Sequence, residues 1–139
     1  MLSFLRLSFL PANADFGLLV LRLVSGGSML WLHGRAKLMD YQKLSETFSP
    51  IIVNSKISLA LTVFAEVLCA GLLILGLFGR SAALVLAITM GVAFFMTHKM
   101  VLVGPKNGEL ALMYLMAFFV LFLSGPGKFS VDGNAGGAA

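Results

Sequence analysis

Four long apolar runs limit what this chain can fold into. They cover Phe16–Leu32, Ile57–Gly79, Ser81–Thr97 and Leu110–Ser124. As helices they would be about 22 to 35 Å long, against a bilayer hydrocarbon core of about 30 Å. Only 12% of the residues are charged, whereas ordinary soluble domains carry about 25%. We therefore expect an all-α, polytopic membrane protein built as a bundle of four transmembrane helices.

The residues outside these runs are too few to form a separate soluble domain. We predict an N-terminal interfacial tail at residues 1–15, a transmembrane domain at 16–126 and a flexible C-terminal tail at 127–139. Between the first and second spans, Leu38–Phe48 alternates apolar and polar residues at about helical spacing. This pattern predicts a short amphipathic helix on the membrane surface.

The charges point to lipid headgroups rather than nucleic acid. The net charge is only +4, and the Lys and Arg residues lie mostly in loops and near the chain ends. More of them fall in the two loops that follow spans one and three than on the side of the termini. The positive-inside rule then places these loops in the cytoplasm and both termini outside. Cys69 is the single cysteine, so neither an intramolecular disulfide nor a redox dithiol can form within one chain.

Glu66 lies near the middle of the second apolar run. A charged side chain at the centre of a membrane helix costs about 2.5 to 3.5 kcal/mol, so it is normally paired or used. Arg22 in the first span is expected at a depth only about 7 Å away, which a long arginine can bridge. We therefore predict a buried ion pair between Arg22 and Glu66, with a structural and a functional role both open.

A second polar group is expected on the loop side of the bundle. His33 ends the first span, His98 ends the third, and Glu109 opens the fourth. The three could be structural, could contact a substrate or quinone, or could bind a metal or haem. None belongs to a tight ligand-spacing motif, so no metal site is predicted, and the chain shows no catalytic motif.

The order and spacing of several short motifs resemble the DoxX family of small bacterial membrane proteins. The resemblance covers about residues 16–132. Its matching elements are Arg22-Leu23, His33-Gly34, Lys37-Leu38, Ala65-Glu66, Gly71, Leu75–Arg80, Ala82-Ala83, His98, Gly108-Glu109, Ala111-Leu112 and Gly125–Asp132.

This resemblance implies a four-helix bundle in the bacterial inner membrane and a link to oxidoreductase complexes or oxidative-stress systems. The favoured hypothesis is a membrane subunit of a redox or quinone-linked complex, with quinone contact near His33, His98 and Glu109. The alternatives are a structural accessory subunit without chemistry of its own and a small proton-coupled transporter or channel. The expected partners are membrane lipid and other membrane or redox-complex subunits, with a homo-oligomer also open. No covalently bound cofactor and no nucleic acid are expected.

Overall fold

The computed structural model describes residues 5, 7, 11–51 and 54–135, and every regular element among them is helical. The first span runs without a break through α2 (Ala14–Ser28), the π-helical η1 (Met29–Gly34) and α3 (Arg35–Met39), and α4 (Tyr41–Thr47) follows it. The second span joins α5 (Ser55–Val63), the π-helical η2 (Phe64–Cys69) and α6 (Ala70–Leu75). The third joins α7 (Gly79–Val92) to the π-helical η3 (Ala93–Thr97), the fourth is α8 (Glu109–Ser124), and α9 (Val131–Asn134) comes last.

The predicted helical membrane bundle is confirmed. Ala14–Met39, Ser55–Leu75 and Gly79–Thr97 are each long and apolar enough to cross a membrane, and Glu109–Ser124 is a shorter apolar helix. The short helix expected between the first two spans is α4, which lies inside the predicted range.

Local signals in the sequence explain where several helices begin and end. The side chain of Asn13 accepts a hydrogen bond from the Phe16 N–H, and that of Asn54 accepts one from the Ile57 N–H. Both asparagines therefore cap the first turn of a span. The second span ends at Leu75, earlier than the apolar run suggests, because Gly76 adopts a left-handed φ of +69°.

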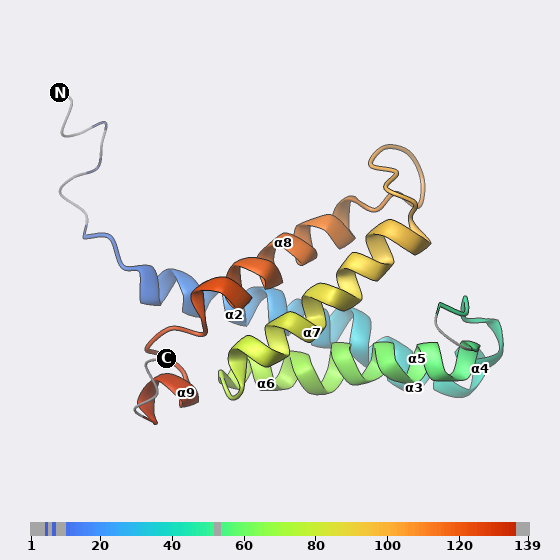
Figure 1. Cartoon of the computed structure of the whole chain (residues 1–139), viewed down its shortest axis with the longest axis horizontal. Helices are drawn as coiled ribbons and strands as arrows, with labels where there is room; N and C mark the ends of the chain where they lie inside the picture. The colour runs from blue at the N-terminus through green and yellow to red at the C-terminus, as the bar shows by residue number, and fades with distance from the viewer. Residues whose placement is uncertain (1–4, 6, 8–10, 52–53, 136–139) are drawn as a thin grey trace.

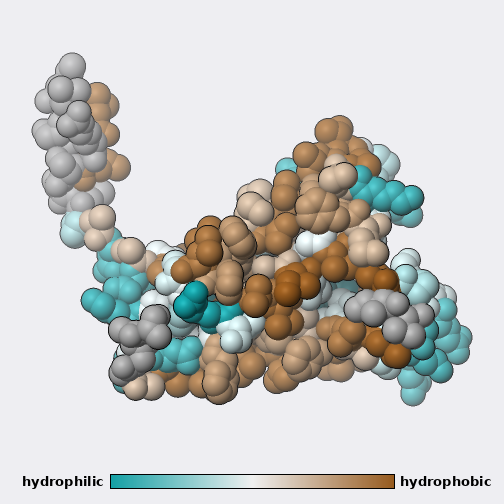
Figure 2. All heavy atoms as spheres, in the orientation of Figure 1, coloured by the Kyte–Doolittle hydropathy of each residue, from teal (hydrophilic) through white to brown (hydrophobic). Residues whose placement is uncertain are grey.

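The helices form two pairs that diverge along the bundle. α7 packs along α8, and α2 packs against α6. Towards the loop side, the α7–α8 pair leans away from α5 (Figure 1). The core between them contains both small and large apolar side chains. Its most deeply buried members include Met29, Ala70, Leu73, Ala83, Leu86 and Phe118. Hydrophobic residues also cover most of the visible face between two hydrophilic ends (Figure 2), as expected for a lipid-facing surface.

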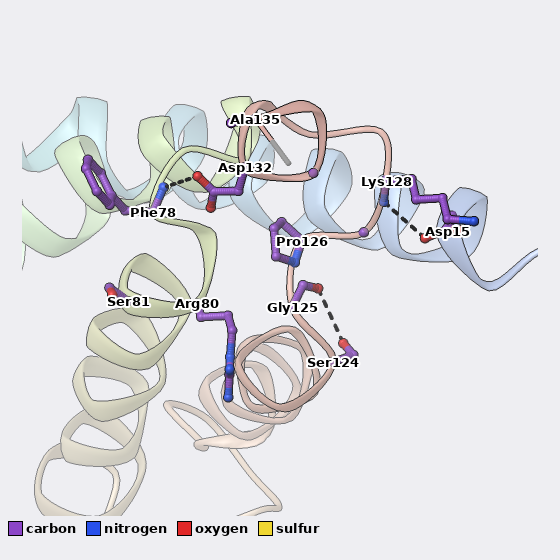
Figure 3. Close-up of a pocket in the computed structure, with 12 residues that line it drawn as sticks. Asp15, Phe78, Arg80, Ser81, Ser124, Gly125, Pro126, Lys128, Asp132 and Ala135 are labelled. Carbon is purple, nitrogen blue, oxygen red and sulfur yellow. Dashed lines mark hydrogen bonds and ion pairs between the residues drawn. The ribbon is translucent and has the colours of Figure 1, made fainter. Parts of the chain in front are cut away.

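The described part of the predicted C-terminal tail, residues 127–135, is bonded to the bundle. Residues 127–135 turn back onto the bundle, where the carboxylate of Asp132 accepts hydrogen bonds from the N–H groups of Phe78 and Gly79 at 3.0 and 2.8 Å (Figure 3). The Lys128 N–H also donates to Asp15 at 3.0 Å. The segment therefore joins the start of α7 to the start of α2. Residues 136–139, like most of the predicted N-terminal tail, lie outside the described residues.

Candidate functional site

Glu66 is buried in the second span and forms an ion pair with Lys37 of the first. Its Oε2 lies 2.6 Å from the Lys37 Nζ. The Glu66 side chain is 4% exposed, and the Lys37 side chain is 23% exposed. The buried carboxylate therefore has a counter-ion, the Lys37 ammonium, whose flexible side chain extends from the loop-side end of the first span.

Arg22 has different partners from those that we predicted. Its Nη1 donates to the Pro126 carbonyl at 2.6 Å, and its Nη2 donates to the Phe129 carbonyl at 2.5 Å. The residue is 2% exposed. Arg22 therefore fastens the C-terminal segment to the first span, and it is not the partner of Glu66.

The register between the first two spans explains this correction. An added Cβ at Gly34 would lie 2.5 Å from the Glu66 carbonyl oxygen, so Gly34 and Glu66 are level. An added Cβ at Gly76 would lie 2.7 Å from Nη1 of Arg22, so the Arg22 guanidinium is level with Gly76. Gly76 is ten residues beyond Glu66, which corresponds to about 15 Å along a helix. The depth of the Arg22 guanidinium therefore differs from that of Glu66 by about twice the offset that we predicted. This distance is too long for a direct ion pair.

The Lys37–Glu66 pair lies at the edge of an interior cavity on the loop side, with a volume of about 310 Å³. Residues from all four spans line it. The polar members are His33, Lys37, Glu66, His98, Asn107 and Tyr114, and the apolar ones are Met29, Met90, Ala93, Leu110 and Ala111. The cavity therefore brings several hydrogen-bond donors together within an otherwise apolar bundle.

His33 and His98 both line this cavity, as the sequence pattern suggested, whereas Glu109 does not. The His33 ring contacts the Tyr114 ring edge to face, with 5.6 Å between their centroids. His98 is held by its Nδ1, which lies 2.9 Å from the Lys106 carbonyl oxygen. Glu109 is exposed in the first turn of α8. The carboxylate of the cavity is therefore that of Glu66.

Three π-helical segments surround the cavity. η1 contributes Met29 and His33, η2 contributes Glu66, and η3 contributes Ala93. π-Helical turns are rare, and they occur frequently at functional sites because they widen a helix locally and redirect its side chains. Their placement on three spans around one polar cavity marks this level of the bundle as the candidate site.

An apolar groove of about 420 Å³ meets this cavity between α5 and α7. The groove and the cavity share five lining residues, which are Lys37, Glu66, Met90, Ala93 and His98. The ion pair and one histidine therefore stand where a cavity with several polar side chains joins a more apolar groove.

A larger hollow of about 580 Å³ lies at the opposite end of the bundle (Figure 3). Its two carboxylates, Asp15 and Asp132, are already bonded to the C-terminal segment and to the start of α7. These carboxylates therefore have a structural role, because they hold the C-terminal segment against the bundle. The candidate site is accordingly the cavity on the loop side.

The sequence analysis missed Lys37, Asn107 and Tyr114. Lys37 follows His33 by four residues, which keeps it on the same helix face once α3 continues the first span. Tyr114 has a polar end inside an apolar run, and its hydroxyl donates to Ser28 Oγ at 2.9 Å. Both signals were available in the sequence. Within residues 11–51 and 54–135, no group of three or more His, Cys, Asp or Glu side chains is placed to hold a metal ion.

These features define a class of protein: a small polytopic helical membrane protein with a polar cavity inside its bundle. The sequence profile of the DoxX family matches residues 17–99, and this protein belongs to that family. The chain is also 38% identical over 112 residues to an uncharacterized protein of Haemophilus influenzae, an alignment that covers 75% of this chain and 80% of the relative. No solved structure matches.

Proposed function

We propose that this protein is a membrane subunit of a redox or quinone-linked complex in the bacterial inner membrane, and that its loop-side cavity binds the quinone head. The junction between the polar cavity and the apolar groove carries this proposal. A quinone has two carbonyl oxygens that accept hydrogen bonds, together with an apolar body. The ammonium of Lys37 and the ring N–H of His33 are donors of the matching kind, whereas the Nδ1–H of His98 already donates to the Lys106 carbonyl.

The site suits binding and orientation rather than electron transfer by the chain itself. Lys37 and Glu66 supply a buried charge pair, and Met90 and Ala93 supply the apolar wall beside it. A quinone supplies two-electron redox chemistry when it is bound. The electron donor in this proposal is a partner subunit, which accords with the membrane-subunit role. The positive-inside rule places the cavity near the cytoplasmic surface.

Quinone retention tests this function directly. The protein is extracted from bacterial membranes into native-lipid nanodiscs, and quinone per protein is compared with quinone per lipid in the bulk membrane. We expect enrichment in the wild type and a loss of enrichment in Glu66→Gln. Glu109→Gln is the matched control, because it removes an exposed carboxylate from the same end of the bundle without touching the cavity. Equal quinone content in all three samples and in bulk lipid would refute the proposal.

The Lys37–Glu66 pair also favours a second candidate, a small proton-coupled transporter. Ionisable residues within membrane spans often lie on ion or proton pathways. Proton flux into liposomes distinguishes the two functions. A transporter requires flux that Glu66→Gln abolishes, whereas a quinone-binding subunit gives none above protein-free liposomes.

A further inference from the structure

The groove between α5 and α7 opens to the outer surface of the bundle. Leu61, Phe64 and Ile88 line it and are 48%, 49% and 59% exposed. The two helices that form its walls diverge towards the loop side (Figure 1). In a membrane this opening faces hydrocarbon rather than water.

Among the described residues, three of the four hydroxyl groups that line the groove, those of Ser58, Thr62 and Thr89 but not that of Thr97, are bonded to the backbone. The Thr62 hydroxyl donates to the Ser58 carbonyl at 2.8 Å, and the Thr89 hydroxyl donates to the Val85 carbonyl at 2.9 Å. Ser58 Oγ accepts a hydrogen bond from the Ile51 N–H at 3.0 Å. The protein's own backbone therefore already engages each of these hydroxyls. The charged lining residues are Lys37 and Glu66, which stand where the groove meets the cavity.

This arrangement selects an occupant with one polar end and one long apolar end. Lipid tails are as apolar as the groove, so hydrophobicity alone gives no preference for any chain that enters it. A chain joined to a head held in the polar cavity is different, because the head fixes it in place. The cavity and the groove, at about 310 and 420 Å³, are each of the size of a small-ligand site.

We infer that the groove holds the isoprenoid chain of the quinone, and that the ligand reaches the cavity sideways from the hydrocarbon layer between the second and third spans. This inference rests on the proposed function. It adds that α5 and α7 determine which quinones are retained, according to the length of their chain.

Blocking the groove without touching the cavity tests this inference. Thr89→Trp places a large ring on the α7 wall, and Thr62→Trp does the same on the α5 wall. Two variants are used so that the test remains possible if one of them does not fold. Leu84→Trp is the control, because Leu84 lies on α7, is 38% exposed and lines none of the cavities described here. The probes are a benzoquinone carrying one isoprene unit and the same head with a long isoprenoid chain that bears a photoreactive group midway.

We expect the long-chain probe to label residues of α5 and α7 in the wild type and in Leu84→Trp. In either groove variant, retention of that probe should fall by about tenfold or more, because the added ring stands in the path of the chain through the groove. The one-isoprene probe should bind all the variants alike. If the groove variants retain both probes fully, or if labelling spreads evenly over the outer surface as it would with phospholipid in the groove, the inference is wrong although the proposed function stands. If neither probe binds the wild type, the proposed function fails and this inference fails with it.

Discussion

Lys37 reaches Glu66 from the loop-side end of the first span, and their charged atoms lie 2.6 Å apart. The two partners are not equally buried, because the Lys37 side chain is 23% exposed and the Glu66 side chain only 4%. Removing one partner of a buried pair leaves an uncompensated charge, which costs about 3 to 5 kcal/mol where neither charge can reach water. The unequal burial makes the two single substitutions distinguishable.

We expect Lys37→Met to destabilise the protein more than Glu66→Gln does. Lys37→Met leaves a carboxylate inside the bundle, whereas after Glu66→Gln the lysine stem can carry its charge to the surface. The double variant should recover most of the loss. Thermal unfolding in detergent, followed by circular dichroism, measures the three variants against the wild type. Equal losses in the two single variants would argue against this account of the pair.

Gly34 determines how closely the first two spans approach each other at the site. A methyl group there would lie 2.5 Å from the Glu66 carbonyl oxygen and 3.0 Å from Cγ2 of Val67. We expect Gly34→Ala to cost about 1 to 3 kcal/mol, because overpacking forces the helices apart. Thermal unfolding in detergent measures this change.

Gly27→Ala is the matched control in the same span. A Cβ at Gly27 meets nothing within 4 Å, and alanine is about 0.5 to 1 kcal/mol more favourable than glycine inside a helix. That variant should be as stable as the wild type or more so. If both variants unfold at the same temperature, the close contact at Gly34 does not set the helix spacing.

The sequence was sufficient to predict the class of fold but not the register between its helices. Apolar run lengths determine how many spans form, and asparagines mark where two of them start. Helical periodicity tells which residues share a face of one helix, but not their depth relative to the next helix. That depth follows from the backbone contact at Gly34 and from the space at Gly76. Consequently Arg22 and Glu66 were both expected to be polar groups within the bundle, yet each was given the wrong partner.

The residues of the candidate site could likewise be predicted only in part from the sequence. His33 and His98 are at helix ends that the sequence makes visible, and both line the cavity. Glu109 was included because of its position in the chain, but its side chain is exposed. The three π-helical segments have no sequence signal that we recognise, since a widened turn depends on the packing of neighbouring helices. The residues that they redirect could therefore be found only in the structure.

Asp132 should stabilise the start of α7 from a distant part of the chain. Its two carboxylate oxygens accept from the Phe78 and Gly79 N–H groups, which have no partner within their own helix. We expect Asp132→Ala to cost about 0.5 to 2 kcal/mol, as the loss of a helix cap does. Asp40→Ala is the control, because the Asp40 side chain makes no cap bond. Chemical unfolding in detergent would contradict the assignment if the two alanine variants were equally stable.

Arg22 should hold the C-terminal segment in a way that lysine cannot reproduce. Its two terminal nitrogens donate to carbonyls of Pro126 and Phe129 at once, and a lysine offers one compact ammonium in place of that rigid fork. We expect Arg22→Lys and Arg22→Met both to release residues 127–135, since each hydrogen bond to a charged group contributes about 1.5 to 3 kcal/mol. Limited proteolysis of the protein in nanodiscs measures the release as faster cleavage within that segment, with Arg35→Lys, a substitution at an exposed position in the same span, as the control. If Arg22→Lys resists cleavage as well as the wild type does, a single positive charge is enough and the fork geometry is not what fixes the segment.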